Sequence, residues 1–244
     1  MDTKPRRALA AGLTPGSGSG VERALSETGF TAVEWTPDAE SALRRIRDLQ
    51  PELVVAAAVL PGTDGVGFAE RVRALRLDVR PALLIQRLPG LALPGAARLE
   101  ALAAAEVDRP LTAEALRSAL AALAPRLNAL PPELEARLES LLDALGVPRH
   151  PGRDCLSRAV ALAWADRRRL RALRDALYVP VARETNLTPA QVERAMRHAI
   201  EVAWRTGEIE QQHRIFGDTI DARRGKPTCG EMIAQLADIL RWEG

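Results

Sequence analysis

Short apolar runs alternate with helical patterns along residues 7–124. More than any other feature of the sequence, this alternation restricts the folds that the chain can adopt. Five runs have the length and composition of buried strands: 8–13, 31–35, 53–59, 82–86 and 104–107. The segments between them have helical character: 20–27, 38–49, 65–75, 96–103 and 112–123. Because mostly continuous apolar strands are typical of sheets buried on both faces, the pattern predicts an α/β domain. Its parallel sheet would be covered by helices, in a (βα)5 arrangement.

The α/β pattern stops at residues 124–132, Ala-Pro-Arg-Leu-Asn-Ala-Leu-Pro-Pro. Prolines interrupt regular structure, so we predict a linker over 125–132. It would separate a first domain in 1–124 from a second domain in 133–244. Only helical patterns follow: a leucine stripe that ends at Gly146, and then segments near 155–165, 167–177, 179–186, 189–206 and 229–242. The second domain is therefore predicted to be all-α.

Composition and charge limit the function without identifying it. A hydrophobic content of 47% supports two cores, and no apolar run approaches the length of a membrane span. We expect a cytoplasmic protein with no membrane contact. The formal charge is only +2, so binding to nucleic acid would have to rest on a local patch. Cys155 and Cys229 lie outside any metal-ligand spacing, and we expect neither a metal site nor a cofactor.

The stretch Leu60-Pro61-Gly62-Thr63-Asp64-Gly65, together with the βα order, resembles the receiver domains of bacterial response regulators. The resemblance covers residues 7–124 and implies a phosphoacceptor aspartate, an acidic Mg²⁺ pair, a hydroxyl and a lysine. This chain departs from the pattern at each position, with Ala57, Gly12 and Leu13, Gln86, and Arg109 before Pro110. Alanine has no nucleophile, so we predict a degenerate receiver with no phosphoacceptor, no catalytic residue and no metal. Asp64 fits ordinary turn chemistry.

Residues 178–207 have the layout of a helix-turn-helix. Thr188 is a good N-cap, Pro189 suits the first helical position, and Gln191 would complete a capping box. Gly207 is a natural end for this second helix. A short helix is predicted just upstream, with a turn at 186–187. The exposed face of the second helix would carry these side chains: Gln191, Arg194, Arg197, His198, Glu201 and Arg205.

A resemblance to one known family rests on four segments of the second domain. They are the string Val-Glu-Arg-Ala-Met-Arg-His-Ala-Ile-Glu-Val-Ala-Trp at 192–204, Tyr178, Phe216-Gly217 and Lys226-Pro227-Thr228. The domain is similar to the DNA-binding domain of the stage-zero sporulation master regulator of endospore-forming bacteria, over about residues 136–243. The resemblance implies binding to double-stranded DNA at TGTCGAA-type boxes. It further implies homodimers on DNA and an interaction with the main sigma factor of RNA polymerase.

The resemblance places base recognition on the exposed face of the helix at 189–206. It makes Glu193 and Arg194 the first candidates, and both suit the task, since Glu accepts from cytosine and Arg pairs with guanine. Arg197 and His198 lie about one turn further on and are predicted to reach bases or phosphates. Family members commonly have Arg at the position of Gln191. The preferred DNA sequence therefore depends on what Gln191 does.

Three hypotheses remain open. The first is a transcription regulator of the sporulation master regulator type that acts without aspartyl phosphorylation. The second is a decoy that pairs with, or competes with, an intact phosphorylatable relative. The third is an enzyme that uses His150 and Cys155, which are five residues apart with Pro151-Gly152 between them as a presumed loop. We expect no enzyme, because no resemblance to a known family supports this His–Cys spacing.

Overall fold

The N-terminal half of the chain is built on a five-stranded parallel sheet. The computed structural model describes residues 6–16, 18–90, 92–217 and 225–243. The strands are β1 (Arg6–Ala11), β2 (Phe30–Thr36), β3 (Leu53–Ala57), β6 (Ala82–Arg87) and β7 (Ala104–Asp108). They lie in the order β2-β1-β3-β6-β7, and every neighbouring pair is parallel. When only the five strands of this sheet are numbered along the chain, the order becomes 2-1-3-4-5, which is the doubly wound order of receiver domains. The predicted fold class is confirmed.

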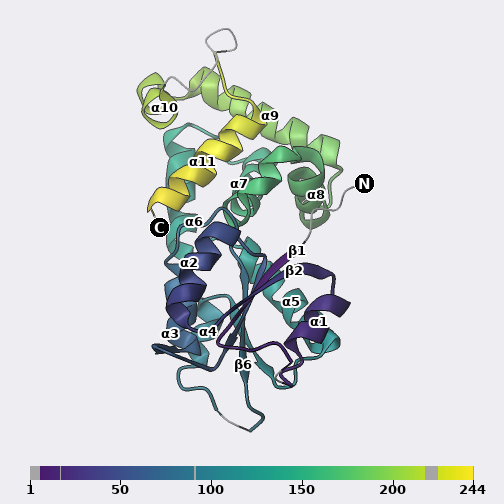
Figure 1. Ribbon diagram of the computed structural model, residues 1–244. Coiled ribbons are helices and arrows are strands. Elements are labelled where there is room, and N and C mark those ends of the chain that lie inside the picture. Colours follow the sequence, from purple (N-terminus) through teal and green to yellow (C-terminus); the bar gives the residue numbers. More distant parts are fainter. Residues whose placement is uncertain (1–5, 17, 91, 218–224, 244) are drawn as a thin grey trace. The chain divides into compact units, whose positions relative to one another are not determined.

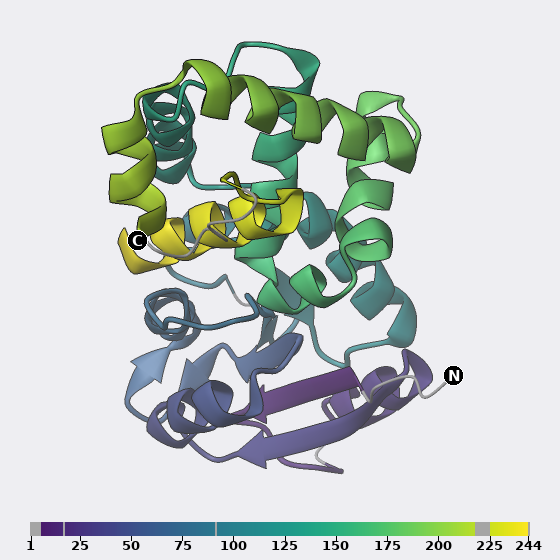
Figure 2. The same ribbon diagram turned by 90° about the horizontal axis from the view of Figure 1, so that it is seen from above.

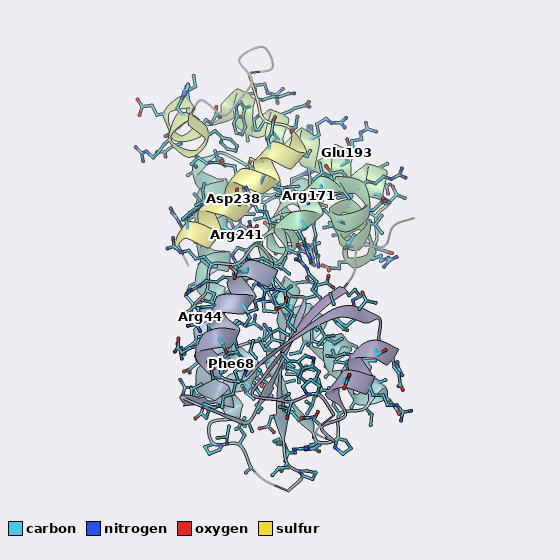
Figure 3. All side chains as sticks on the ribbon, viewed as in Figure 1. Arg44, Phe68, Arg171, Glu193, Asp238 and Arg241 are labelled. Atoms are coloured by element: carbon cyan, nitrogen blue, oxygen red, sulfur yellow. The ribbon has the colours of Figure 1, made fainter. Side chains whose placement is uncertain are left out.

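Helices cover both faces of this sheet (Figure 1). One core holds α1 (Val21–Glu27) and α5 (Ala113–Asn128) against one face. The other core holds α2 (Ala39–Leu49), α3 (Gly65–Arg73) and α4 (Ala97–Ala101) against the opposite face. Phe68 of α3, labelled in Figure 3, is fully buried in the second core. Successive strand residues alternate between the two cores, which is why the strands are apolar throughout.

Two strands end earlier than the apolar runs that predicted them. The run 8–13 ends as a strand at Ala11, because Gly12 has a φ of 66° and its amide donates to Thr36 at 2.8 Å. The run 53–59 divides at Ala58. β3 ends at Ala57, and a hairpin of β4 (Val59–Leu60) and β5 (Thr63–Asp64) follows. Apolar composition alone did not mark either turn.

The predicted linker over residues 125–132 is only partly non-helical. α5 continues to Asn128 with Pro125 inside it, and α6 begins at Pro132. Proline removes one helical N–H, but its fixed φ suits the helix, and Leu123 and Leu127 still pack into the first unit's core. Compact units comprise Met1–Leu127 and Asn128–Gly244, so the connection is confined to a few residues.

The C-terminal unit is helical throughout its described residues (Figures 1 and 2). Its elements are α6 (Pro132–Ala144), α7 (Pro151–Ala165), η1 (Arg167–Arg171), η2 (Arg174–Tyr178), α8 (Val179–Thr185), α9 (Pro189–Thr206), α10 (Ile209–Phe216) and α11 (Cys229–Glu243). Two predictions were wrong in detail. Residues 167–177 form a 3₁₀ and a π segment rather than one helix, and α10 was not predicted. No helix in the described ranges is long and apolar enough to cross a membrane.

The packing of α9 on α7 lies at the centre of this unit. One stripe of α9 is buried: Val192, Met196, Ala199, Ile200 and Ala203. Gly152 of α7 lies directly against the backbone of α9, so that a Cβ there would overlap the carbonyl of Ala195. Gly207 ends α9 in extended rather than left-handed backbone. Its need for glycine comes from crowding, because a Cβ would lie 2.6 Å from the Leu145 oxygen.

Charged side chains attach α11 to neighbouring elements of the same unit. Asp238 pairs with Arg167 of η1 at 2.8 Å and with Arg241 of its own helix at 2.9 Å. Arg241 also donates to the Ala163 and Trp164 carbonyls at the end of α7. These bonds fix the carboxyl-terminal half of α11, while its first turn lies near α9.

Replacing Gly152 by alanine tests the close packing of α7 on α9. We expect Gly152→Ala to lower the free energy of unfolding by about 1–3 kcal/mol, because backbone overlap outweighs the gain in helix propensity. The measurement is urea unfolding of the full chain followed by tryptophan fluorescence. Ser140→Ala, at an exposed helical position, is the control and should stay within about 0.5 kcal/mol of the parent. Equal stability of the two variants would contradict the packing described here.

Candidate nucleic-acid interface

The position expected for a phosphoacceptor is occupied by Ala57 at the carboxyl end of β3, opposite Gln86 of β6. Gln86 is buried, and its amide donates to the Ser19 carbonyl at 2.7 Å. The amide therefore holds the loop after β1 where a receiver would have a hydroxyl near the phosphoryl group. Nothing at Ala57 can attack phosphorus.

Apolar packing replaces the expected acidic pair beside this position. The side chain of Leu60 is buried, and its Cγ lies 3.1 Å from where a Cβ on Gly12 would be. Asp64 accepts from the Gly67 amide at 2.7 Å and so caps α3. Its role is structural, in agreement with the turn chemistry expected for it.

The helix-turn-helix predicted at 178–207 is formed by α8, a short turn and α9. Asn186 ends α8 with a φ of 58°, the left-handed conformation that asparagine tolerates. Thr188 then caps α9, with Pro189 at the first helical position. α9 contains 18 residues and is about 27 Å long. Its first turns are free of the core on one side, which is the geometry of a recognition helix.

Gln191 takes part in the capping box. The side-chain oxygen of Gln191 accepts from the backbone amide of Thr188 at 2.8 Å. In return, the backbone amide of Gln191 donates to the Thr188 hydroxyl at 3.3 Å. The Gln191 side chain is thus occupied within the protein. A bidentate contact with adenine, which needs this oxygen, would have to displace the capping interaction, whereas the Nε2 group can still donate to a base.

Arg194 and His198 lie on the outer side of α9. Arg194 is exposed and makes no hydrogen bond or ion pair with the described residues. His198 is exposed, and its ring lies edge-on to His150, with 5.8 Å between the ring centroids. The arginine is therefore available to an external acceptor, whereas the histidine already has an aromatic neighbour.

Glu193 and Arg197 form an ion pair along a neighbouring side of α9. Glu201, four residues further on, pairs with Lys226 at 2.7 Å, and this ammonium lowers the pKa of the Glu201 carboxyl. The five residues predicted to contact DNA therefore all lie on α9, but they differ in the contacts that they already make within the protein. From the sequence alone, Lys226 is a basic residue of the Lys226-Pro227-Thr228 segment that supports the family resemblance. Its contact with α9 could not be seen from residues 25 positions apart in the chain.

His150 and Cys155 have structural roles. The ring of His150 accepts from the Gly152 amide at 3.2 Å and caps α7, so Pro151-Gly152 begin a helix and are not a loop. Cys155 is fully buried, and burial raises the pKa of its thiol. Within the described residues no group of three or more His, Cys, Asp or Glu is placed to hold a metal ion.

A family model described as the sporulation initiation factor Spo0A C terminal matches residues 138–240. The match covers the helices of the C-terminal unit from α6 to α11, including the helix-turn-helix.

Solved structures similar to this chain include two response regulators and a pseudo-receiver. The chemotaxis response regulator CheY4 of Vibrio cholerae is 18% identical, with 49% of this chain and 99% of that chain covered and a TM-score of 0.41. Full-length FixJ from B. japonicum is 18% identical, with 87% and 96% covered and a TM-score of 0.41. The pseudo-receiver domain of the CikA protein is 26% identical, with 49% and 98% covered and a TM-score of 0.37.

The chain therefore joins a unit with the 2-1-3-4-5 parallel sheet to an all-helical unit that matches the Spo0A C-terminal family model. The matched residues 138–240 are less than half of the chain, so the family model describes the C-terminal unit and not the N-terminal one.

Thiol reactivity tests the structural roles of the cysteines. Burial raises the pKa of Cys229 from 9.0 to about 11, which lowers its thiolate fraction at pH 8 roughly 100-fold. We expect the native protein to react very slowly with a disulfide reagent at pH 8, and both thiols to react fully after denaturation. Ser140→Cys, with a thiol at an exposed position, is the positive control. Rapid reaction of the native parent would show an accessible, activated cysteine.

Proposed function

We propose that this protein binds specific DNA sequences as a transcription regulator, that α9 reads the bases, and that this needs no aspartyl phosphorylation. The observation that carries the proposal is Arg194, which is exposed in the first turns of a capped helix-turn-helix and has no partner among residues 6–16, 18–90, 92–217 and 225–243. Arginine pairs in bidentate fashion with guanine in the major groove. The proposed target is a TGTCGAA-type box, which comes from the family resemblance.

Glu193 and Arg197 can join Arg194 at the DNA at little cost. Their ion pair is exposed, and such a pair four residues apart contributes only about 0.3–0.5 kcal/mol. Opening it releases a carboxylate for a cytosine amino group and a guanidinium for a base or phosphate. His198 can reach the phosphate backbone from the next turn. Gln191 is the least available of the five candidates, because its contact with DNA competes with the capping box.

Loss of phosphorylation is supported by the filled site at the end of β3. Ala57 offers no nucleophile, and Leu60 packs where Gly12 replaces the first member of the acidic pair. The N-terminal unit therefore keeps the receiver fold without the receiver reaction. In this proposal it contributes to dimerisation or to control of DNA binding by a different signal.

Two partner assignments rest on the family resemblance alone. They are a homodimer on DNA and contact with the main sigma factor of RNA polymerase. The proposal also keeps the cytoplasmic location expected from the lengths of the apolar runs. They complete the proposal of a regulator. The decoy hypothesis shares the DNA contact and differs in promoter output.

Removing Arg194 tests base recognition. We expect Arg194→Ala to lose about 1–3 kcal/mol of preference for a TGTCGAA duplex over a scrambled duplex, because a bidentate base contact is lost. Fluorescence anisotropy at fixed salt measures both affinities. Arg117→Ala removes one exposed positive charge from the N-terminal unit and is the matched control. An equal loss on both duplexes would assign Arg194 to the phosphate backbone instead.

Acetyl phosphate tests the independence from phosphorylation. We expect the full chain to bind the box duplex with the same affinity with and without acetyl phosphate and Mg²⁺, because Ala57 cannot accept a phosphoryl group. The fragment 128–244 is measured alongside. Tighter binding by the fragment would make the N-terminal unit inhibitory, and a phosphate-dependent gain would contradict the proposal. A promoter fusion then separates a regulator, which changes expression alone, from a decoy, which acts only beside an intact relative.

A further inference from the structure

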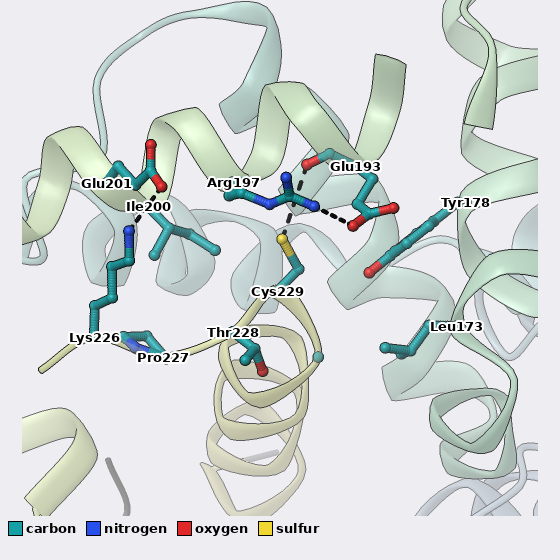
Figure 4. A pocket seen from close by; sticks show the side chains of 11 residues that line it. Leu173, Tyr178, Glu193, Arg197, Ile200, Glu201, Lys226, Pro227, Thr228 and Cys229 are labelled. Atoms are coloured by element: carbon teal, nitrogen blue, oxygen red, sulfur yellow. Dashed lines mark hydrogen bonds and ion pairs between the residues drawn. The ribbon is translucent and has the colours of Figure 1, made fainter. Parts of the chain in front are cut away.

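A cavity of about 520 Å³ lies between α9 and the start of α11, on the side of α9 that carries Glu193 and Arg197 (Figure 4). Its volume is within the range of about 300–1,000 Å³ that is usual for small-molecule sites. Leu173, Ile200 and Pro227 give it apolar walls. Gly230 keeps it open near Leu173, since a Cβ there would lie 2.9 Å from the leucine Cδ1.

The charged groups at this cavity are already paired with one another. Glu193 pairs with Arg197, and Glu201 pairs with Lys226 at 2.7 Å (Figure 4). Each carboxylate thus has a cation beside it, while each cation can accept a second anionic neighbour. Since each carboxylate can in turn accept from a second donor, the four charges cancel and give no preference of their own, and a preference for an anion has to rest on the uncharged donors of the cavity.

Hydrogen-bond donors without partners also face the cavity. Tyr178 is 94% buried, with an exposed fraction of only 6%. Its hydroxyl points into the cavity and makes no hydrogen bond with the described residues (Figure 4). Burial raises the pKa of Tyr178 to about 12, so the hydroxyl stays protonated and can donate. The amides of Cys229 and Gly230, in the first turn of α11, also have no acceptor in the described part of the chain.

We propose that this cavity binds a small organic anion, a carboxylate carried on an aromatic or branched apolar body. The apolar body lies against Leu173, Ile200 and Pro227. The carboxylate accepts from the Tyr178 hydroxyl or the first turn of α11, and pairs with Lys226 and Arg197. An uncharged ligand of the same shape fills the apolar part but leaves the donors unsatisfied. The site therefore selects for the anion.

Binding at this site is coupled to DNA binding, a step that rests on the proposed function of α9. Arg197 lines the cavity and is also a proposed DNA contact. A bound carboxylate holds Arg197 toward the cavity and places negative charge close to the DNA phosphates. The ligand therefore weakens DNA binding, and DNA weakens ligand binding by the same factor. Such a ligand would supply a signal to a chain that lacks the phosphoacceptor.

The test uses the full chain labelled with fluorotyrosine. Tyr178 is the single tyrosine, so one fluorine resonance reports on the cavity. Indoleacetate is the anionic probe, and tryptophol is the uncharged probe with the same ring system. We expect indoleacetate to shift the resonance saturably, and tryptophol to bind more weakly. Lys226→Gln should weaken indoleacetate binding about fivefold without affecting tryptophol, as one charge-assisted contact is lost.

Matched variants and a DNA titration separate the two parts of the inference. Lys226→Arg should keep indoleacetate binding, and Arg205→Gln, which removes a charge of α9 that does not line the cavity, should leave it unchanged. No saturable shift, or equal binding of both probes that Lys226→Gln does not alter, would overturn the site. Saturating indoleacetate should weaken binding to the box duplex about fivefold. Unchanged DNA affinity with a filled cavity would overturn the coupling. If the protein binds no DNA at all, the proposed function fails, while the fluorine titration still decides the site.

Discussion

The contact between α7 and α9 determines what the C-terminal unit can present to DNA. α9 buries one stripe against the core, so the rotation of the helix about its axis is set by Val192, Met196 and Ala199. Gly152 brings the backbones close enough that the helices cannot separate or slide without losing this packing. The exposed side of α9 is therefore defined by the hydrophobic core. The capping box at Thr188 adds to this, because it fixes where the helix begins and which residues occupy its first turns.

The N-terminal unit shows that a receiver fold is maintained by burial and not by its reaction chemistry. The apolar strands pack helices on both faces, and neither core requires an aspartate at the end of β3. Where a receiver has hydrated carboxylates and Mg²⁺, this chain has Ala57, Gly12 and the buried Leu60. Removing the acidic groups also removes their mutual repulsion and their need for a metal ion. The same sheet therefore persists without the acidic groups, with the apolar side chain of Leu60 packed beside Gly12.

Much of this structure could be predicted from the sequence, because its dominant patterns are local. Continuous apolar runs predicted the parallel strands, and Thr188, Pro189 and Gln191 predicted the first turn of α9. The errors arose where tertiary contacts override local signals. Pro125 did not end α5, because Leu123 and Leu127 continue the buried side of the helix. The ion pair of Glu201 with Lys226, and the cavity beside it, depend on bringing α11 against α9. No local pattern contains that information.

The two sides of α9 differ in a way that bears on regulation. Arg194 is exposed and has no partner in the described residues, so the DNA contact proposed for it would need no rearrangement of the protein. Glu193 and Arg197 are paired at the edge of a cavity, so their contribution depends on what the cavity holds. A ligand that competes for Arg197 would change affinity while leaving the Arg194 contact, and hence the choice of sequence, largely intact. In the proposed function, separate residues on one helix would determine which DNA is bound and how tightly it is bound. Such a separation would suit a chain that has Ala57 at the position of a phosphoacceptor.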